Sequence, residues 1–251
     1  MSVGYTVDVS DKVPTPLFSI ITVVRNGVNT IENCIQSVAN QSLRDFEYIV
    51  IDGLSDDGTT ELISKHLNSI NSYVCEKDLG IYDAMNKAIM MCRGKFIGII
   101  NSDDAYFEDT LLNVRQSILN YPDSQIIYGG IQFITQEGGT LFVGHEDLNN
   151  VMIPHPSCFV NSDAYRQFGM FNPGFKIAAD YDFMLRAFNE GAIFHNTGLV
   201  LAKYRPGGAS AKNRFKSIQE MITIQSNHLN WSRFYRTYRL IRYLLGTYLI
   251  R

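Results

Sequence analysis

The first hundred residues alternate between short apolar runs and segments with helical spacing, and this alternation constrains the fold more than any other feature. Runs typical of buried strands occupy Leu17–Val24, Phe46–Ile51, Tyr73–Cys75 and Lys95–Ile100. Segments that predict helices lie between them, at Ile31–Val38, Thr59–Leu67 and Ile81–Cys92. Strands that alternate with helices indicate βαβ units and a mostly parallel sheet covered by helices on both faces.

The remainder of the chain has a looser pattern. Residues 128–144 predict a β-hairpin with its turn at residues 137–139, and Leu199–Lys203 predicts a last strand. A helix is expected to start at Asp180 or Asp182 and to end at Gly191. Near the N-terminus, Asn29 and Glu32 have the spacing of a capping box for the first helix.

Composition favours one large domain, alone or with an appendage. The chain has 251 residues, of which 45% are hydrophobic and 19% are charged, enough for a sizeable core. No apolar stretch has the 18 residues expected of a spanning helix, and no basic segment followed by a long apolar block predicts a secretion signal. The four cysteines lie far apart in the sequence, which is typical of reduced thiols in a cytosolic protein.

Acidic residues follow the predicted strands. Asp52 ends the second strand, Asp78 follows the third, and Asp103 and Asp104 follow the fourth. In such sheets ligands bind outside the carboxyl ends of the strands, so these acids are expected to gather at one binding edge. Adjacent carboxylates repel each other unless a cation lies beside them, and this pair therefore indicates a divalent-metal site.

Five segments in order, SIITVVRN, IVIDGLSDDGT, EKDLGIYDAMNKAI, GKFIGIINSDD and AADYDFMLRA, resemble the inverting family 2 glycosyltransferases. The resemblance covers residues 16–210 and is strongest to bacterial enzymes that build colanic acid, O-antigen and capsule repeat units. It implies a GT-A fold, Rossmann-like with helices flanking the sheet, as one domain over residues 15–210. Residues 211–251 are predicted to form a helical extension.

The resemblance implies a metal-dependent transfer of one sugar. The donor is a nucleoside diphosphate sugar, most often linked to uridine diphosphate, and the acceptor is a hydroxyl of a lipid-linked glycan. The implied cofactor is Mn²⁺ or Mg²⁺, held by Asp103 and Asp104, whose shares in binding it stay open. The family's first metal-site aspartate is replaced by Asn101. The QxxRW signature of processive members is absent, which suggests a single transfer.

The resemblance also implies the residues of the donor pocket. Asp52 is expected to recognise the nucleotide base, and Asp78 to flank it. Thr22 and Arg25 are candidate ligand contacts or plain surface residues. The segment YRPGGAS, residues 204–210, is either a mobile loop that approaches the donor phosphates or a surface turn.

An inverting transfer needs a general base for the acceptor hydroxyl, and the matching position is Asp180. Asp182 is the competing candidate, and either acid also suits the first turn of a helix. His155 is a candidate metal ligand, but a structural or acceptor-site role is the more common one for a lone histidine between prolines. His195 is expected to be structural.

The last forty residues carry a separate signal. From Lys212 to Arg251 there are eight Lys and Arg against one acid, Glu220, on an otherwise acidic chain. Residues 231–251 place apolar and aromatic side chains on one helical side and Arg236, Arg239 and Arg242 toward the other. Contact with a membrane surface and docking on the catalytic domain both stay open. Membrane contact implies a cytoplasmic, peripheral protein at the inner face of the membrane.

Two other functions compete with this interpretation. A nucleotidyltransferase that makes sugar nucleotides shares a similar core, but it brings a loop rich in glycine and basic residues after its first strand. VVRNGVNT has one Arg and one Gly. A non-catalytic glycan- or partner-binding member is disfavoured by the retained Asp103, Asp104 and Asp180. Nucleic acid is excluded as a partner, because the body is acidic and no nucleic-acid-binding module is recognised.

Overall fold

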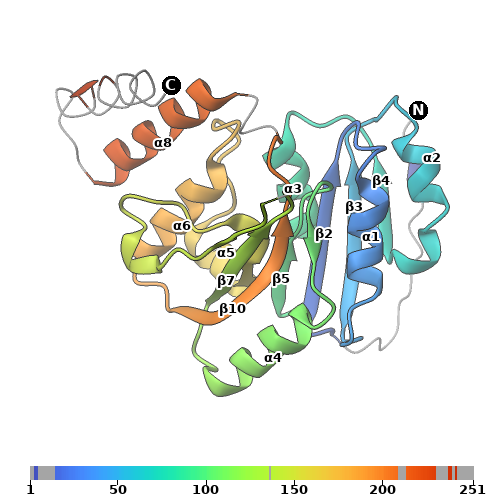
Figure 1. The fold of residues 1–251 in the computed structure, drawn as a ribbon, viewed down its shortest axis with the longest axis horizontal. Coiled ribbons are helices and arrows are strands. Elements are labelled where there is room, and N and C mark those ends of the chain that lie inside the picture. The colour runs from blue at the N-terminus through green and yellow to red at the C-terminus, as the bar shows by residue number, and fades with distance from the viewer. Residues whose placement is uncertain are drawn as a thin grey trace.

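The computed structural model describes residues 3–4, 15–135, 137–208, 213–229, 237–238 and 241 (Figure 1). The strands are β1 Val3–Gly4, β2 Phe18–Val24, β3 Phe46–Asp52, β4 Ser72–Cys75, β5 Phe96–Ile99, β6 Ala105–Tyr106, β7 Ile126–Phe133, β8 Thr140–Leu141, β9 Cys158–Asn161 and β10 Phe194–Tyr204. The helices are α1 Ile31–Ala39, α2 Thr59–Ser64, α3 Ile81–Met91, α4 Thr110–Asn120, α5 Ser162–Phe168, α6 Ala179–Asn189 and α8 Arg214–His228, with 3₁₀ turns η1 Leu67–Ser69, η2 His145–Asp147 and η3 His155–Ser157.

One sheet runs through the molecule in the order β1-β4-β3-β2-β5-β9-β7-β10-β6, with β8 paired to β7 (Figure 1). Strands β4, β3, β2 and β5 are parallel, as the alternation predicted, and β7 and β10 form a second parallel pair. The two groups are joined through β9, which is antiparallel to both β5 and β7. The predicted hairpin is confirmed, because β8 pairs antiparallel with the end of β7.

The first helix starts differently from the sequence prediction. Thr30, not Asn29, is the N-cap residue of α1, and no side chain caps it, so the predicted capping box is wrong. The backbone supplies the closure instead, because the N–H groups of Thr30 and Ile31 both donate to the Gly27 carbonyl oxygen, at 3.0 and 2.9 Å. A backbone turn after β2 therefore sets the start of the helix.

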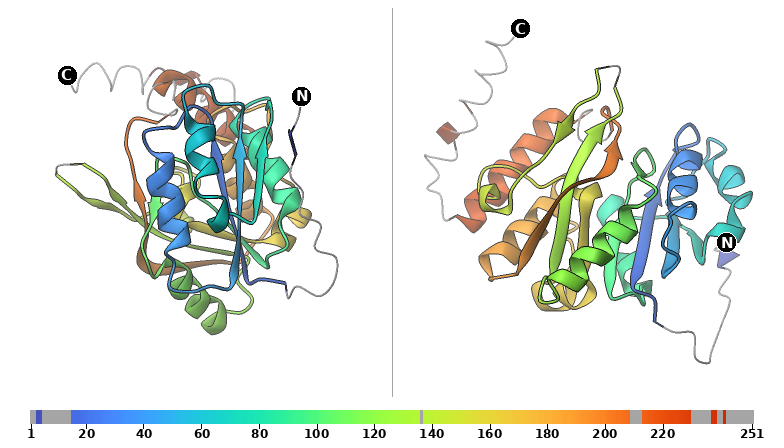
Figure 2. Two further views of the ribbon diagram at one scale, coloured as in Figure 1. Left: turned by 90° about the vertical axis from the view of Figure 1, so that its right-hand side faces the viewer. Right: turned by 60° about the horizontal axis from the view of Figure 1, so that its bottom comes forward.

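Helices cover both faces of the sheet (Figure 2). Side chains of β2 alternate between the faces: Phe18 and Ile20 pack in one apolar cluster with residues of α1 and α4, and Ile21 and Val23 in another with residues of α3, α5 and α6. Both faces of the central parallel strands are therefore buried, which explains why their sequences are apolar almost throughout.

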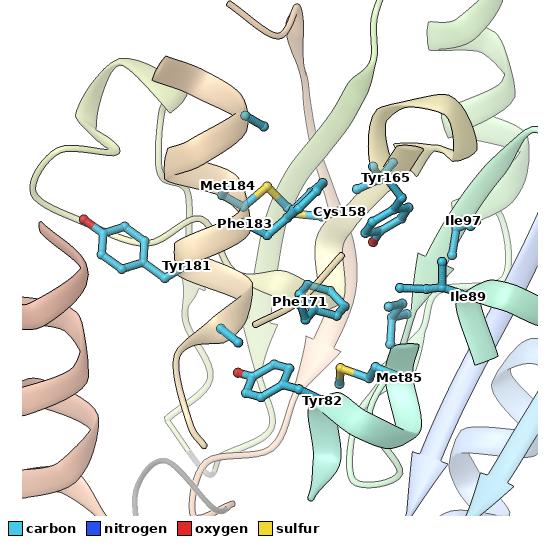
Figure 3. Close-up of a cluster of buried hydrophobic side chains, with 14 of the residues drawn as sticks. Tyr82, Met85, Ile89, Ile97, Cys158, Tyr165, Phe171, Tyr181, Phe183 and Met184 are labelled. Atoms are coloured by element: carbon cyan, nitrogen blue, oxygen red, sulfur yellow. The ribbon is translucent and has the colours of Figure 1, made fainter. Parts of the chain in front are cut away.

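Aromatic side chains fill the second cluster and fix α3 against α6 (Figure 3). The Phe171 ring lies 5.5 Å from Tyr82 and 5.8 Å from Phe183, and Tyr165 stacks on Phe183 at 4.8 Å, all measured between ring centroids. Each aromatic contact of this kind stabilises the fold by about 0.5–1.5 kcal/mol beyond the contribution of the apolar area that it buries. The first turns of α3 and α6 are thus held in a fixed relation, and both reach the site described below.

Further sequence predictions concern the cysteines, membrane-spanning helices and the C-terminal segment. All four cysteines are free, and Cys34 and Cys158 are buried. Within the described ranges, none of the helices combines the length and the hydropathy that crossing a bilayer requires. The amphipathic helix predicted over residues 231–251 lies outside the described residues, apart from residues 237–238 and 241, which are helical.

Candidate active site

A cavity of about 870 Å³ opens where β2 and β5 end and the segment before α6 begins. Four of the predicted site residues line it: Arg25, Asp78, Asp103 and Asp180. A neighbouring cavity of about 650 Å³, on the side of α1, shares Asp103 and adds Asp104. The structure therefore brings these five residues, drawn from distant segments, to adjoining cavities at the carboxyl ends of the parallel strands.

The loops after β2 and β3 are tied together beside the cavity. Ser55 Oγ accepts a hydrogen bond from the Asn26 N–H at 2.8 Å, and Asn26 Oδ1 accepts one from the Asp56 N–H at 3.0 Å. Asn26 has a left-handed backbone with φ of 56°, a conformation that asparagine tolerates better than most residues. Asp78 and Arg25 both lie against Gly53, where a side chain would collide with the Asp78 carboxylate.

Thr22 and Asp52 are buried in the interior and line neither cavity. Thr22 is fully buried, and its hydroxyl accepts a hydrogen bond from Tyr48 at 3.0 Å. Asp52 is also fully buried; Oδ1 accepts hydrogen bonds from the N–H and hydroxyl of Ser55, and Oδ2 accepts them from the hydroxyls of Thr60 and Tyr73. Asp52 therefore supports the loop after β3, whereas Thr22 is bonded to side chains of β3 and α1 in the interior.

The two acids after β5 differ in their surroundings. Asp104 is almost fully buried, and its carboxylate accepts hydrogen bonds from the Arg205 N–H at 2.9 Å and from Asn101 Nδ2 at 3.3 Å. Burial raises the pKa of Asp104 to about 7, and the charge of Asp103 adds to the rise. Asp103 lines both cavities, and the loop that follows β10 passes close to it at Gly208.

These residues fit a hard divalent cation. Asn101 Oδ1 is buried without a hydrogen-bond partner among the described residues, so a third oxygen lies in the same turn as the two carboxylates. Mg²⁺ and similar ions commonly bind one or two carboxylates together with substrate phosphates. Within the described residues, no group of three or more His, Cys, Asp or Glu side chains is arranged to hold a metal ion.

Asp180 lies in the first turn of α6 and is 9% exposed. The Tyr82 hydroxyl from α3 lies 2.8 Å from Asp180 Oδ1 and 2.7 Å from the Ile177 carbonyl oxygen, so its single proton serves two acceptors. Burial and the nearby carboxylate raise the pKa of Tyr82 well above its ordinary value, which keeps the phenol protonated and able to donate. The tyrosine therefore orients the carboxylate.

Asp182 is engaged elsewhere. Its carboxylate is bonded to Arg186 Nη1 at 3.0 Å and to His228 Nε2 of α8 at 2.9 Å, and it does not line the cavity. Of the two candidate bases, only Asp180 lines the large cavity. Asp182 instead joins two helices.

His155 and His195, the two histidines discussed from the sequence, have different environments. His155, in the 3₁₀ turn η3, lines the large cavity; it is 8% exposed, and neither ring nitrogen has a hydrogen-bond partner among the described residues. Burial lowers its pKa, although the charge of Asp180 opposes the shift. His195 stacks on Tyr121 with ring centroids 3.8 Å apart, in agreement with the structural role predicted for it.

Sequence reasoning missed Tyr82 and Arg205 and treated Asn101 only as a departure from a pattern. Tyr82 lies within EKDLGIYDAMNKAI, but nothing in its spacing reveals a contact to a residue 98 positions later. Arg205 lines both cavities, and its backbone holds Asp104. Its place in the segment YRPGGAS was the available signal.

The chain matches the family described as Glycosyl transferase family 2 over residues 19–182, well over half of its length. The chain belongs to this family. Among its relatives, a PGL/p-HBAD biosynthesis glycosyltransferase of Mycobacterium tuberculosis is 28% identical over 202 residues, covering 77% of this chain and 78% of that protein. A chondroitin synthase of Escherichia coli is 25% identical over 225 residues, which span 83% of this chain and 33% of the synthase. Membership favours the predicted glycosyltransferase over the nucleotidyltransferase.

Solved structures confirm the GT-A fold. TarS of S. aureus in complex with UDP-GlcNAc superposes with a TM-score of 0.71 at 17% identity, covering 90% of this chain and 71% of that one. A mannosyltransferase of Pyrobaculum calidifontis in complex with GDP-Man and Mn²⁺ gives a TM-score of 0.68 at 17% identity, over 87% and 65% of the two chains. The predicted α/β fold is thus correct, including the presence of a C-terminal helix.

Proposed function

We propose that this glycosyltransferase moves a single sugar, with inversion, from a uridine diphosphate sugar to a hydroxyl of a lipid-linked glycan. One observation carries the proposal: Asp103, with the features of a cation ligand, and Asp180, a buried carboxylate oriented by a tyrosine, line the same cavity. Inverting transfer needs these two functions on either side of one reacting carbon.

In the proposed reaction, the oxygen of the acceptor hydroxyl forms a bond to the anomeric carbon of the donor sugar. Asp180 accepts the proton of that hydroxyl as the bond forms. The bond between that carbon and the diphosphate oxygen breaks, and the nucleoside diphosphate departs with the bonding electrons. Tyr82 donates to one oxygen of Asp180 and so fixes the direction in which the carboxylate faces the acceptor. General-base catalysis of this kind typically contributes about 10²–10⁴-fold in rate.

The leaving diphosphate requires positive charge beside it. Asp103, Asp104 and the side-chain oxygen Oδ1 of Asn101 would hold Mn²⁺ or Mg²⁺, and the ion would supply positive charge beside the diphosphate. Arg205 lines both cavities, as Asp103 does. Arg25 lines the larger cavity and lies with Asp78 against Gly53, and these two residues suit the nucleotide end of the donor. The missing QxxRW signature supports one transfer for each acceptor.

The donor assignment can be tested by thermal denaturation with a panel of UDP-, GDP- and dTDP-sugars in the presence of Mn²⁺. A UDP-sugar at 100 times its Kd is expected to stabilise the protein by about 2.7 kcal/mol, which is roughly 5–10 °C in Tm for a chain of this size. The shift is expected to disappear when EDTA replaces Mn²⁺. A shift with GDP-mannose but not with UDP-sugars would reassign the nucleotide, and no shift with any sugar nucleotide would contradict the proposed donor site.

The basic C-terminal segment supports a lipid-linked acceptor and a position at the inner face of the cytoplasmic membrane. Replacing Arg236, Arg239 and Arg242 by Glu in the 251-residue chain is expected to abolish sedimentation with vesicles that contain anionic phospholipid. Each basic residue near an anionic surface contributes about 1 kcal/mol of attraction. Replacing three arginines by glutamates therefore removes about 3 kcal/mol of attraction and adds repulsion between the new carboxylates and the lipid.

Donor binding serves as the control, because the substitutions leave unchanged all the residues that line the two described cavities. The variant is expected to keep the Tm shift that UDP and Mn²⁺ produce in the parent chain. Equal sedimentation of the variant and the parent would contradict membrane contact through this segment and would favour docking on the catalytic domain.

A further inference from the structure

The C-terminal helix α8 packs beside α6, the helix that carries Asp180 (Figure 1; Figure 2, right). Tyr181 points toward α8 in Figure 3, and its hydroxyl accepts a hydrogen bond from Gln225 Nε2 at 3.0 Å. His228 bonds Asp182 one turn further along α8. Two successive turns of α8 therefore hold the two residues that directly follow the proposed base.

A third contact from α8 reaches the backbone directly before Asp180. Glu220 Oε1 accepts the Lys176 N–H at 2.9 Å, and Oε2 accepts the N–H groups of Ile177 at 2.8 Å and Ala178 at 3.1 Å. One carboxylate thus binds three consecutive backbone N–H groups. Hydrogen bonds to an ionised acceptor are about twice as strong as neutral ones.

Glu220 supplies the N-terminal hydrogen-bond acceptor that α6 lacks in its own sequence. The N-cap residue of α6 is Ala178, whose side chain has no oxygen to accept from the first helical N–H groups. An anion near a helix N-terminus is favoured by the helix dipole, and Glu220 supplies it from another helix. The same stretch of backbone includes the Ile177 carbonyl that shares the Tyr82 hydroxyl with Asp180.

Helix α8 also forms part of the cavity. Ser217 and Met221, one turn apart, line it together with Asp180 and Lys176. Glu220 adjoins Met221, so the helix that holds the base also shapes the space for the acceptor. The predicted boundary at residue 210 would assign this helix to an appendage, yet its side chains take part in the candidate site.

We infer that Glu220 is a positioning residue for catalysis, which places Asp180 by holding residues 176–178, and that α8 is an integral part of the active site. This inference rests on the proposed role of Asp180 as the general base. Glu220 is bonded to backbone N–H groups and does not line the cavity, so its loss is expected to affect turnover rather than donor binding.

The test replaces Glu220 by Gln, which keeps the shape of the side chain but removes its charge and one acceptor. We expect amides 176–178 to exchange with deuterium about tenfold or more faster in the variant, because their charged partner is lost. We expect kcat to fall roughly 10–100-fold, with the donor identified by the thermal panel, since small misplacements of a catalytic group have effects of this size. The Kd for UDP with Mn²⁺ is expected to stay within about twofold.

Two further variants make the test specific. Glu190→Gln makes the same chemical change at the exposed C-terminal end of α6 and is expected to leave kcat and exchange at residues 176–178 unchanged. Glu220→Asp keeps the charge on a shorter side chain and is expected to lose less activity than Glu220→Gln. If Glu220→Gln does not fold, the same measurements of kcat, amide exchange and Kd for UDP are made on Glu220→Asp.

The outcomes separate this inference from the proposed function. Normal kcat in Glu220→Gln, with or without faster exchange, would overturn the positioning role, provided that Asp180→Asn is inactive. Full activity of Asp180→Asn would instead overturn the proposed function itself. A loss of UDP binding in Glu220→Gln equal to its loss of kcat would show a general structural effect and would also overturn the inference.

Discussion

Asp180→Asn is expected to lower the rate of sugar transfer by about 10²–10⁴-fold, the usual contribution of a general base. The amide has the shape of the carboxylate and keeps an oxygen that can accept from the Tyr82 hydroxyl, so the fold of the α6 start is expected to persist. Donor binding is expected to stay near normal, because the proposed base acts on the acceptor and not on the donor. The measurement is transfer in a single-turnover assay, alongside the Kd of UDP with Mn²⁺.

Asp182→Asn is the matched control, because it makes the same change two residues later on the same buried helix turn. Asp182 is bonded to Arg186 and His228, and removing one partner of a buried ion pair costs about 3–5 kcal/mol. The control is therefore expected to lower Tm and leave kcat within a few-fold of the parent. If Asp182→Asn loses transfer while Asp180→Asn retains it, the assignment of the base is reversed.

Local patterns in the sequence were sufficient to predict the parallel half of the sheet. Because β2, β3 and β5 are buried on both faces, their sequences are continuous apolar runs, and such runs are easy to recognise. The placement of Asp78 and Asp103 at one edge follows from the rule that parallel strands end on the same side. The rule fixes the edge but not the direction of each side chain, and Thr22 and Asp52 turn into the interior.

Contacts between distant segments could not be predicted. Glu220 lies 42 residues or more from the backbone that it holds, and Tyr82 lies 98 residues from Asp180. Neither contact has a signature in spacing, because helix packing brings the partners together. The charge pattern even favoured separating Glu220 from the catalytic domain, since it is the one acid in a basic segment. Hydrophobic periodicity likewise shows that α1 exists, but not that the backbone of Gly27 closes its start.

Asp103→Asn is expected to abolish metal-dependent transfer and to weaken Mn²⁺ binding in the presence of UDP by about 10²-fold or more. The loss is expected because a hard cation prefers ionised carboxylate oxygens, and the other proposed ligands are Asp104 and the neutral side chain of Asn101. Titration calorimetry of Mn²⁺ into protein saturated with UDP measures this directly, and removal of metal by EDTA is expected to give the same inactive state in the parent. Asp123→Asn, an exposed acid that lines neither cavity, is the control and is expected to change neither quantity.

Asp104→Asn decides how the two acids share the ion. Asp104 is buried, and burial raises its pKa to about 7, so without metal its charge is costly and its replacement is expected to leave Tm unchanged or higher. With Mn²⁺ and UDP present, the parent gains Tm by ligand binding, whereas a variant that has lost a ligand of the ion gains less. If Asp103→Asn keeps the full Mn²⁺-dependent gain and Asp104→Asn loses it, Asp104 is the main ligand. If both variants keep the gain, the cation does not bind at this turn, and the proposed role of Asp103 in the departure of the diphosphate is wrong.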